Sequence, residues 1–480
     1  MKFVAVGIYV AILLVIAFFS MKKTKTLNDF FLGNRSIGPW VSAFAYGTTY
    51  FSAVLFIGYA GKVGWGFGIS TLWIVLGNAA IGSFLAWKLL AKKTRAMTVT
   101  LSSVTMPGFL EKRYQSKNLK IVAALIIFVF LVPYSASVYM GLSYFFESVF
   151  GIPYLYALVF MAIMTAIYLT MGGYFAITLT DFFQGIVMII GVFLLLFFVV
   201  TNPQVGGLSN VLPSLAAVDP RLASPIGPPG GVALFSLVIL TSLGPWGLPQ
   251  MIHKFYSIKN EKVISTATWA TTAFALIIAT GAYFTGSLSH LFISDLSEVG
   301  NNVDRIMPAI INSTVPEAMA VLILLLVLAA SMSTLASLVL VSSSSIAVDL
   351  LQSIRPKTDQ STSVLIMRIL SVLFIAFSLY LAVTPNIILN LMAFSWGTVA
   401  GAFIGPYLFG LLYKKTTKAG AWSGLLTGSG FCIVFSIFYP DNVPLVGSLA
   451  MVLSILVVPV VSAFTTPMPQ EHITFVFNEE

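Results

Sequence analysis

Residues 244–249 read Gly244-Pro245-Trp246-Gly247-Leu248-Pro249 and lie inside a long apolar stretch, 231–252. Proline lacks a backbone N–H and clashes with the preceding helical turn, so two prolines here predict a broken helix. A second apolar stretch, 40–60, is interrupted by Gly47-Thr48-Thr49-Tyr50-Phe51-Ser52. Interrupted apolar segments at matching positions of two halves are typical of transporters built from inverted repeats. The alternative is that both interruptions only kink packed helices.

The composition places the chain in a lipid bilayer. Its 480 residues are 58% hydrophobic and 9% charged, with a mean hydropathy of +0.97. Soluble domains carry about a quarter charged residues, so this chain has too little polar surface to coat a soluble globule. The net charge of +9 lies in short clusters between apolar runs, which argues against a nucleic-acid partner. One cysteine and three histidines argue against a metal centre built from these residues.

A helix needs about 20 apolar residues to cross the hydrocarbon layer. This length predicts an all-α integral membrane protein with about thirteen transmembrane helices. The predicted spans are 3–20, 40–60, 67–91, 121–149, 153–171, 177–200, 231–252, 265–293, 317–347, 364–383, 387–412, 419–438 and 443–464. The stretch 98–112 is shorter and contains Pro107-Gly108, which predicts an interfacial or re-entrant segment.

The distribution of basic residues predicts the orientation of these spans. With the N-terminus outside, only Lys2, Lys62, Arg221 and Arg305 fall in outer loops, which leaves 21 of the 25 basic residues inside. Lys254 is counted among the inner-loop residues. Because inner loops of membrane proteins are enriched in Lys and Arg, we expect a multi-pass cell-membrane protein with an outer N-terminus and a cytoplasmic C-terminus.

Two further features lie within predicted spans. Ser333, Thr334 and Ser337 are three or four residues apart and share one face of the ninth span. Their hydroxyls suit a hard cation such as Na⁺, although small residues also allow close helix packing. Asp181 lies about one turn inside the sixth span, and an intramembrane carboxylate is expected to be functional. The alternative for Asp181 is a residue that caps its helix or reaches the interface.

Several motifs, in this order, resemble the sodium:solute symporter family, whose members carry proline, pantothenate, sugars and sialic acid. The first motif is Asp29-Phe30-Phe31-Leu32-Gly33-Asn34-Arg35-Ser36-Ile37-Gly38. The others are Met171-Gly172-Gly173 with Thr180-Asp181-Phe182-Phe183-Gln184, Ala330-Ser331-Met332-Ser333-Thr334 with Ser343-Ser344, and Ser395-Trp396-Gly397 with Gly405-Pro406. The resemblance covers nearly the whole chain.

The resemblance implies a LeuT-like fold, in which two five-helix repeats have opposite orientations and contain discontinuous helices. One helix precedes this core and two follow it. The expected divisions are a first helix and cytoplasmic loop (1–36), a first repeat (37–200), an extracellular loop (201–230), a second repeat (231–412), two C-terminal helices (413–464) and a cytoplasmic tail (465–480).

The resemblance also implies the site residues. A sodium site would use the backbone carbonyls of Thr48, Phe51 and Ala330 with the hydroxyls of Ser333 and Thr334. Asp181 and Ser337 would form a second sodium site or a coupling group, although Ala336 replaces one hydroxyl of the family's second site. The residues expected to line the solute site are Ser52, Tyr134, Trp246, Pro249 and Gln250.

The sequence indicates the coupling ion more specifically than the transported solute. The segment pattern is closest to the proline and pantothenate permeases, but Tyr50 replaces an aspartate of the proline permeases, and Thr241 and Pro245 replace aromatic residues. Leu55 replaces a glutamine of the sugar carriers.

We therefore expect a sodium-coupled symporter that imports proline or another amino or organic acid by alternating access. The alternatives are a pantothenate or carboxylate symporter, a proton-coupled carrier, or a transporter-like membrane sensor. We expect no enzyme activity, Na⁺ as the coupling ion without an organic cofactor, and a monomer.

Overall fold

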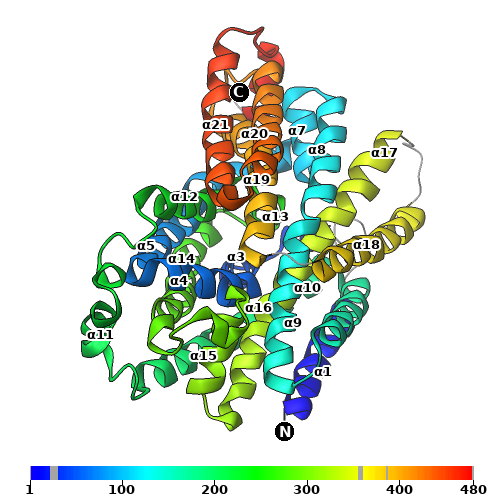
Figure 1. The fold of residues 1–480 in the computed structure, drawn as a ribbon. Helices are drawn as coiled ribbons and strands as arrows, with labels where there is room; N and C mark the ends of the chain where they lie inside the picture. The colour runs from blue at the N-terminus through cyan, green and yellow to red at the C-terminus, as the bar shows by residue number, and fades with distance from the viewer. Residues whose placement is uncertain (1, 22–30, 355–359, 385–386, 478–480) are drawn as a thin grey trace.

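The computed structural model describes residues 2–21, 31–354, 360–384 and 387–477 (Figure 1). Within these ranges every extended regular element is a helix, and one isolated β-bridge joins Ile37 to Ile258. The all-α prediction is therefore confirmed. Seven residues used in the sequence analysis lie outside the described ranges: Lys22, Lys23, Lys25, Asp29, Phe30, Arg355 and Lys357.

The α-helices of the first half are α1 (Lys2–Met21), α3 (Pro39–Tyr50), α4 (Ala60–Phe67), α5 (Leu72–Gly77), α6 (Lys92–Thr100), α7 (Met106–Tyr114), α8 (Lys117–Phe130), α9 (Val132–Phe150) and α10 (Tyr154–Thr201). Those of the second half are α11 (Val211–Val218), α12 (Gly231–Gly247), α13 (Pro249–Tyr256), α14 (Lys262–Ser287), α15 (Ile306–Thr314), α16 (Glu317–Ser344), α17 (Leu351–Ile354), α18 (Gln360–Val383), α19 (Ile388–Leu412), α20 (Lys418–Phe438), α21 (Val443–Ala463) and α22 (Gln470–Phe477). Four π-helical segments continue these helices: η2 (Val54–Tyr59), η4 (Asn78–Leu85), η5 (Trp87–Ala91) and η11 (Ser345–Leu350).

Among the described residues, nine helices are long and apolar enough to cross a membrane, or ten if the bent pair α12–α13 is one span. Two more predicted spans correspond to the shorter apolar helices Val4–Ser20 and Tyr154–Ile167. The predicted spans 40–60 and 67–91 are accommodated by α3 together with the helical run Val54–Thr100. Each predicted span thus falls on a helix. The predicted gap between residues 171 and 177 is not a gap, because α10 is continuous over 48 residues.

Both predicted helix breaks are present in the structure. The helix α3 ends at Tyr50, Phe51 has an extended backbone (φ −108°, ψ 98°), and the helical structure resumes at Val54. The helix α12 ends at Gly247, Leu248 is extended (φ −79°, ψ 122°), and α13 departs at 45°. A residue before proline is disfavoured in the helical region, so Pro249 explains why the second break falls at Leu248.

The broken helices lie at the centre of the molecule, where α16 packs against α3, α9 and α10 and α12 packs against α19. The helices α19, α20 and α21 form a bundle at one end, and α1 packs on α10 (Figure 1). In this view the N-terminus and α15 lie toward one end of the molecule, and the C-terminus and α7 toward the other.

The segment α4 that follows the first break is held close to α14 by glycine. A Cβ added to Gly286 would lie 1.9 Å from the Ala60 carbonyl oxygen, and a Cβ added to Gly64 would lie 2.1 Å from the Gly286 carbonyl carbon. Small residues let two backbones approach in a membrane, where van der Waals packing is a main source of helix association. This contact positions α4, and with it one wall of the site described next.

Candidate functional site

A cluster of oxygen atoms lies between the end of α3 and the middle of α16. The Ser333 hydroxyl donates to the Thr48 carbonyl (3.0 Å) and the Ala330 carbonyl (3.2 Å). The Thr334 hydroxyl lies 3.3 Å from the Thr48 carbonyl and 3.1 Å from the Ala330 carbonyl. All four residues are fully buried. The structure therefore brings together four of the five residues predicted for the sodium site.

Phe51, the fifth, lies at the break itself. Because Phe51 has an extended ψ of 98°, its carbonyl does not point along the helix axis as an α-helical carbonyl does. A helix break inside a membrane protein leaves carbonyls free to coordinate an ion, because the i+4 N–H groups no longer occupy them. Two hydroxyls and several carbonyls would surround a sodium ion with neutral oxygens, provided that the hydroxyl hydrogens rotate away from it.

A small cavity lined by buried residues lies at the same break. Its volume is about 20 Å³, which is space for about one water molecule. It is lined by Tyr50, Phe51, Ser52, Leu55, Tyr59, Asn78, Thr241, Tyr283, Met392 and Trp396. Among the described residues, the lining holds five aromatic side chains and no charged side chain. At about 20 Å³ the cavity must expand to admit an organic solute.

Tyr50 connects the two broken helices across this cavity. Its hydroxyl donates to the Thr241 carbonyl on α12 (2.7 Å). Its ring stacks on Phe51, with centroids 4.3 Å apart, and more distantly on Trp396 at 6.2 Å. A side chain that bonds to one helix and stacks on another holds the walls of the cavity together.

The residues predicted to bind solute are divided by the structure. Ser52 lines the cavity, and Tyr134 packs edge-on against Trp396 with ring centroids 5.7 Å apart. Tyr134, Trp246, Pro249 and Gln250 are not among the lining residues. Trp246 donates its indole N–H to the Ile81 carbonyl (3.0 Å), Pro249 begins α13, and Gln250 is buried.

Sequence reasoning missed most of the cavity wall, including Tyr59, Asn78, Tyr283 and Met392. Three other wall residues, Tyr50, Leu55 and Thr241, are positions at which the sequence departs from the proline or sugar carriers. Trp396 belongs to a motif that carries the family resemblance. Departures from a family pattern were thus a usable signal for the solute site, although the sequence did not show that these positions meet.

A second cluster lies one turn further along α16, and it contains a residue that the sequence analysis misplaced. Asp181 on α10 and Ser337 on α16 approach each other around the side chain of Lys254. The Lys254 ammonium lies 3.0 Å from Asp181 Oδ2 and 3.0 Å from Ser337 Oγ, and its side chain is 1% exposed. The prediction that Lys254 lies in an inner loop is therefore wrong: α13 continues to Tyr256 and carries Lys254 into the protein. Asp181 is also fully buried, which excludes the interfacial alternative.

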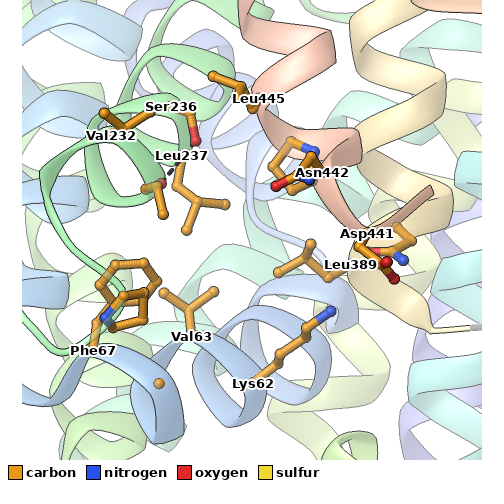
Figure 2. Close-up of a pocket in the computed structure, with 15 residues that line it drawn as sticks. Lys62, Val63, Phe67, Val232, Ser236, Leu237, Leu389, Asp441, Asn442 and Leu445 are labelled. Atoms are coloured by element: carbon orange, nitrogen blue, oxygen red, sulfur yellow. Dashed lines mark hydrogen bonds between the residues drawn. The ribbon is translucent and has the colours of Figure 1, made fainter. Parts of the chain in front are cut away.

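A larger cavity of about 400 Å³ lies near the small one (Figure 2). Its walls come from α4, α12, the start of α19 and the start of α21, and they include Lys62, Leu237, Leu389 and Asp441. The two cavities are lined by neighbouring turns of the same helices: on α12, Leu237 of the larger cavity is one turn from Thr241 of the smaller. On α19, Leu389 of the larger cavity is likewise one turn from Met392 of the smaller. The two cavities therefore lie near each other along α12 and α19.

Comparisons with known proteins agree with this arrangement. Residues 30–428 match the model of the sodium:solute symporter family. A sodium/proline symporter of Staphylococcus aureus strain bovine RF122 / ET3-1 is 32% identical over 443 residues, which cover 90% of this chain and 85% of the relative. Another sodium/proline symporter of Staphylococcus aureus is 31% identical over 442 residues, with the same coverage.

Two solved structures share the fold. A sodium-coupled sialic acid symporter in a substrate-bound outward-open state matches with a TM-score of 0.80 at 17% identity over 98% of both chains. Mhp1, a nucleobase-cation-symport-1 family transporter in a closed conformation, matches with a TM-score of 0.55 at 17% identity over 93% of this chain and 97% of Mhp1. The family match and the curated relatives show that this chain belongs to the sodium:solute symporter family and is a sodium-coupled symporter of a small organic solute with a LeuT-like fold.

Proposed function

We propose that the chain imports proline or another small amino or organic acid together with sodium held by Thr48, Phe51, Ala330, Ser333 and Thr334. The observation that carries this proposal is the convergence of the two α16 hydroxyls on the Thr48 carbonyl at the helix break. Those oxygens come from two separate elements, so an ion between them stabilises one relative position of α3 and α16. A sodium ion is therefore able to select the conformation that receives the solute.

The small cavity supports a solute that carries a carboxylate. No charged side chain of the described residues lines the cavity, but the helical run that begins at Val54 directs its N-terminus toward it. Helix N-termini favour anions because their first N–H groups are free and the helix dipole is positive there. Two of these N–H groups already donate to Ser52: that of Val54 to its hydroxyl oxygen at 3.2 Å and that of Leu55 to its carbonyl at 3.0 Å. Ser52 and Tyr134 are proposed to contact the solute first, and Trp246, Pro249 and Gln250 to reach it when the cavity expands.

Proline is a candidate because the curated relatives at 32% and 31% identity are sodium/proline symporters. Three residues of the cavity wall differ from the residues that the family's proline or sugar carriers have at the same positions: Tyr50, Leu55 and Thr241. These differences favour a solute other than those that the relatives carry. Pantothenate or another small carboxylate remains the second candidate.

We propose alternating access as the mechanism. Sodium and solute enter from the larger cavity, each raises the affinity for the other by the same factor, and the repeats 37–200 and 231–412 then move relative to each other. An inward-negative potential contributes about 2.3 kcal/mol per charge per 100 mV to accumulation. The orientation proposed is an outer N-terminus, which places the larger cavity outside and the tail 465–480 in the cytoplasm. The chain is proposed to act as a monomer.

The test is uptake into proteoliposomes that contain the purified protein. Proline, other amino acids, pantothenate and small carboxylates are screened under an inward sodium gradient and, separately, under an inward proton gradient without sodium. We expect at least one solute to accumulate under the sodium gradient and not under the proton gradient. Accumulation driven by protons alone would contradict sodium coupling, and binding without accumulation of any solute would favour the membrane-sensor alternative.

A further inference from the structure

Lys254 has no part in the sodium site or the cavity, yet it is one of the most deeply buried charges in the described part of the chain. Its ammonium contacts Asp181 of α10 and Ser337 of α16 at 3.0 Å each. The Ser337 hydroxyl in turn lies 3.1 Å from the Thr49 hydroxyl of α3. The ammonium also faces the ring of Tyr174, with its centroid at 5.4 Å. Four helices thus meet around a single positive charge.

The burial of these groups requires that the charge be compensated. Taking an ammonium and a carboxylate out of water costs several kcal/mol for each ion, and removal of one partner leaves the other uncompensated. The side chains of Asp181 and Lys254 are 0% and 1% exposed, so each is the other's principal compensation. The second Asp181 oxygen, Oδ1, has no hydrogen-bond partner among the described residues. The carboxylate therefore keeps free capacity to bind a cation.

The groups around the ammonium form a donor set that suits a free cation. A carboxylate oxygen from Asp181 and a hydroxyl oxygen from Ser337 both lie within hydrogen-bond distance of one point, and the Thr49 hydroxyl lies beside them. Hard cations such as Na⁺ take carboxylate, hydroxyl and carbonyl oxygens as ligands. In this chain that point is filled by the Lys254 Nζ atom, which is covalently attached to α13.

We propose that Lys254 is a tethered cation that takes the place of a second sodium ion, so that the chain binds one sodium ion per transport cycle. Asp181 and Ser337 then act in coupling: their bonds to Lys254 tie α13, the inner half of the second broken helix, to α10 and α16. This inference rests on the proposed sodium site between α3 and α16. Removal of the lysine charge exposes the carboxylate and opens the second position to a sodium ion from solution.

The experiment is equilibrium binding of ²²Na⁺ to the purified full-length protein at pH 8, which needs no knowledge of the solute. We expect one ion per wild-type chain and none in Ser333→Ala with Thr334→Ala. The variant Lys254→Met keeps a long apolar side chain but removes the charge, and we expect it to bind two ions. The double variant Lys254→Met with Asp181→Asn removes both charges and is expected to bind one.

The charge-conserving variant Lys254→Arg is the matched control and is expected to bind one ion. Two ions in the wild-type chain would overturn the inference, and so would one ion in a folded Lys254→Met variant. An ion retained after the Ser333 and Thr334 substitutions would also overturn it, and this result does not depend on whether Lys254→Met folds. Absence of sodium binding to the wild-type chain would contradict the proposed sodium site itself, which distinguishes failure of the two proposals.

Discussion

Replacing both α16 hydroxyls, Ser333→Ala with Thr334→Ala, is expected to abolish most sodium-driven solute uptake at physiological sodium concentrations, because half-maximal uptake then needs far more sodium. These hydroxyls lie 3.0 and 3.3 Å from the Thr48 carbonyl and are the side-chain oxygens of the proposed site. Contacts to a charged group contribute about 1.5–3 kcal/mol each, and 1.4 kcal/mol corresponds to a tenfold change in affinity. Loss of both therefore predicts sodium affinity lower by about a hundredfold or more. The measurement is the sodium concentration that gives half-maximal uptake into proteoliposomes.

Two other hydroxyls of α16 provide the matched control. Ser331 and Ser343 are also buried, but each donates to a carbonyl of its own helix, that of Val327 and that of Val339, at 2.6 Å. The double variant Ser331→Ala with Ser343→Ala should keep the wild-type sodium dependence. If the Ser333 and Thr334 substitutions leave sodium activation unchanged, the oxygen cluster is not the coupling site.

The substitution Tyr50→Ala is expected to reduce uptake by at least about tenfold, because three contacts of Tyr50 hold together the wall of the proposed solute cavity. It bonds to the Thr241 carbonyl, stacks on Phe51 and faces Trp396. Truncation of a large buried aromatic residue to alanine costs about 3–5 kcal/mol, part of which comes from the cavity that remains. A cavity of about 20 Å³ would gain the space of the whole ring, so its wall would lose these contacts. Initial uptake rates at several solute concentrations measure the effect.

Tyr50→Phe separates the ring from the hydroxyl. This variant keeps both stacking contacts and loses only the bond to Thr241, so we expect a loss of several-fold at most. Uptake by Tyr50→Ala at the wild-type rate would show that Tyr50 does not hold the site together. Equal losses in the two variants would assign the effect to the hydroxyl alone.

The sequence was sufficient to predict the second helix break because local stereochemistry determines it. Pro249 disfavours a helical conformation at Leu248, and no tertiary contact is needed for that result. The same holds for Ser333, Thr334 and Ser337, because Ser337 lies four and three residues after the other two, and residues at these spacings share a helix face in any fold. These predictions depended only on neighbours in the chain.

The position of Lys254 could not be predicted in this way. A lysine that follows an apolar stretch is statistically an inner-loop residue, and the sequence does not show that α13 extends to Tyr256. Its burial depends on Asp181, which is 73 residues away in the chain, because an ammonium enters the protein only where a carboxylate compensates it. The solute cavity has the same origin: Tyr59, Asn78, Tyr283 and Met392 meet only when the helices pack.

The central claim is that sodium and solute cross the membrane together, and solute-driven sodium movement tests it most directly. Proteoliposomes with equal ²²Na⁺ inside and outside and no membrane potential are given an inward gradient of the transported solute. The account predicts that ²²Na⁺ rises transiently inside above its outer concentration with the wild-type protein, and not with the Ser333→Ala, Thr334→Ala variant. Solute entry without any sodium uptake would contradict it.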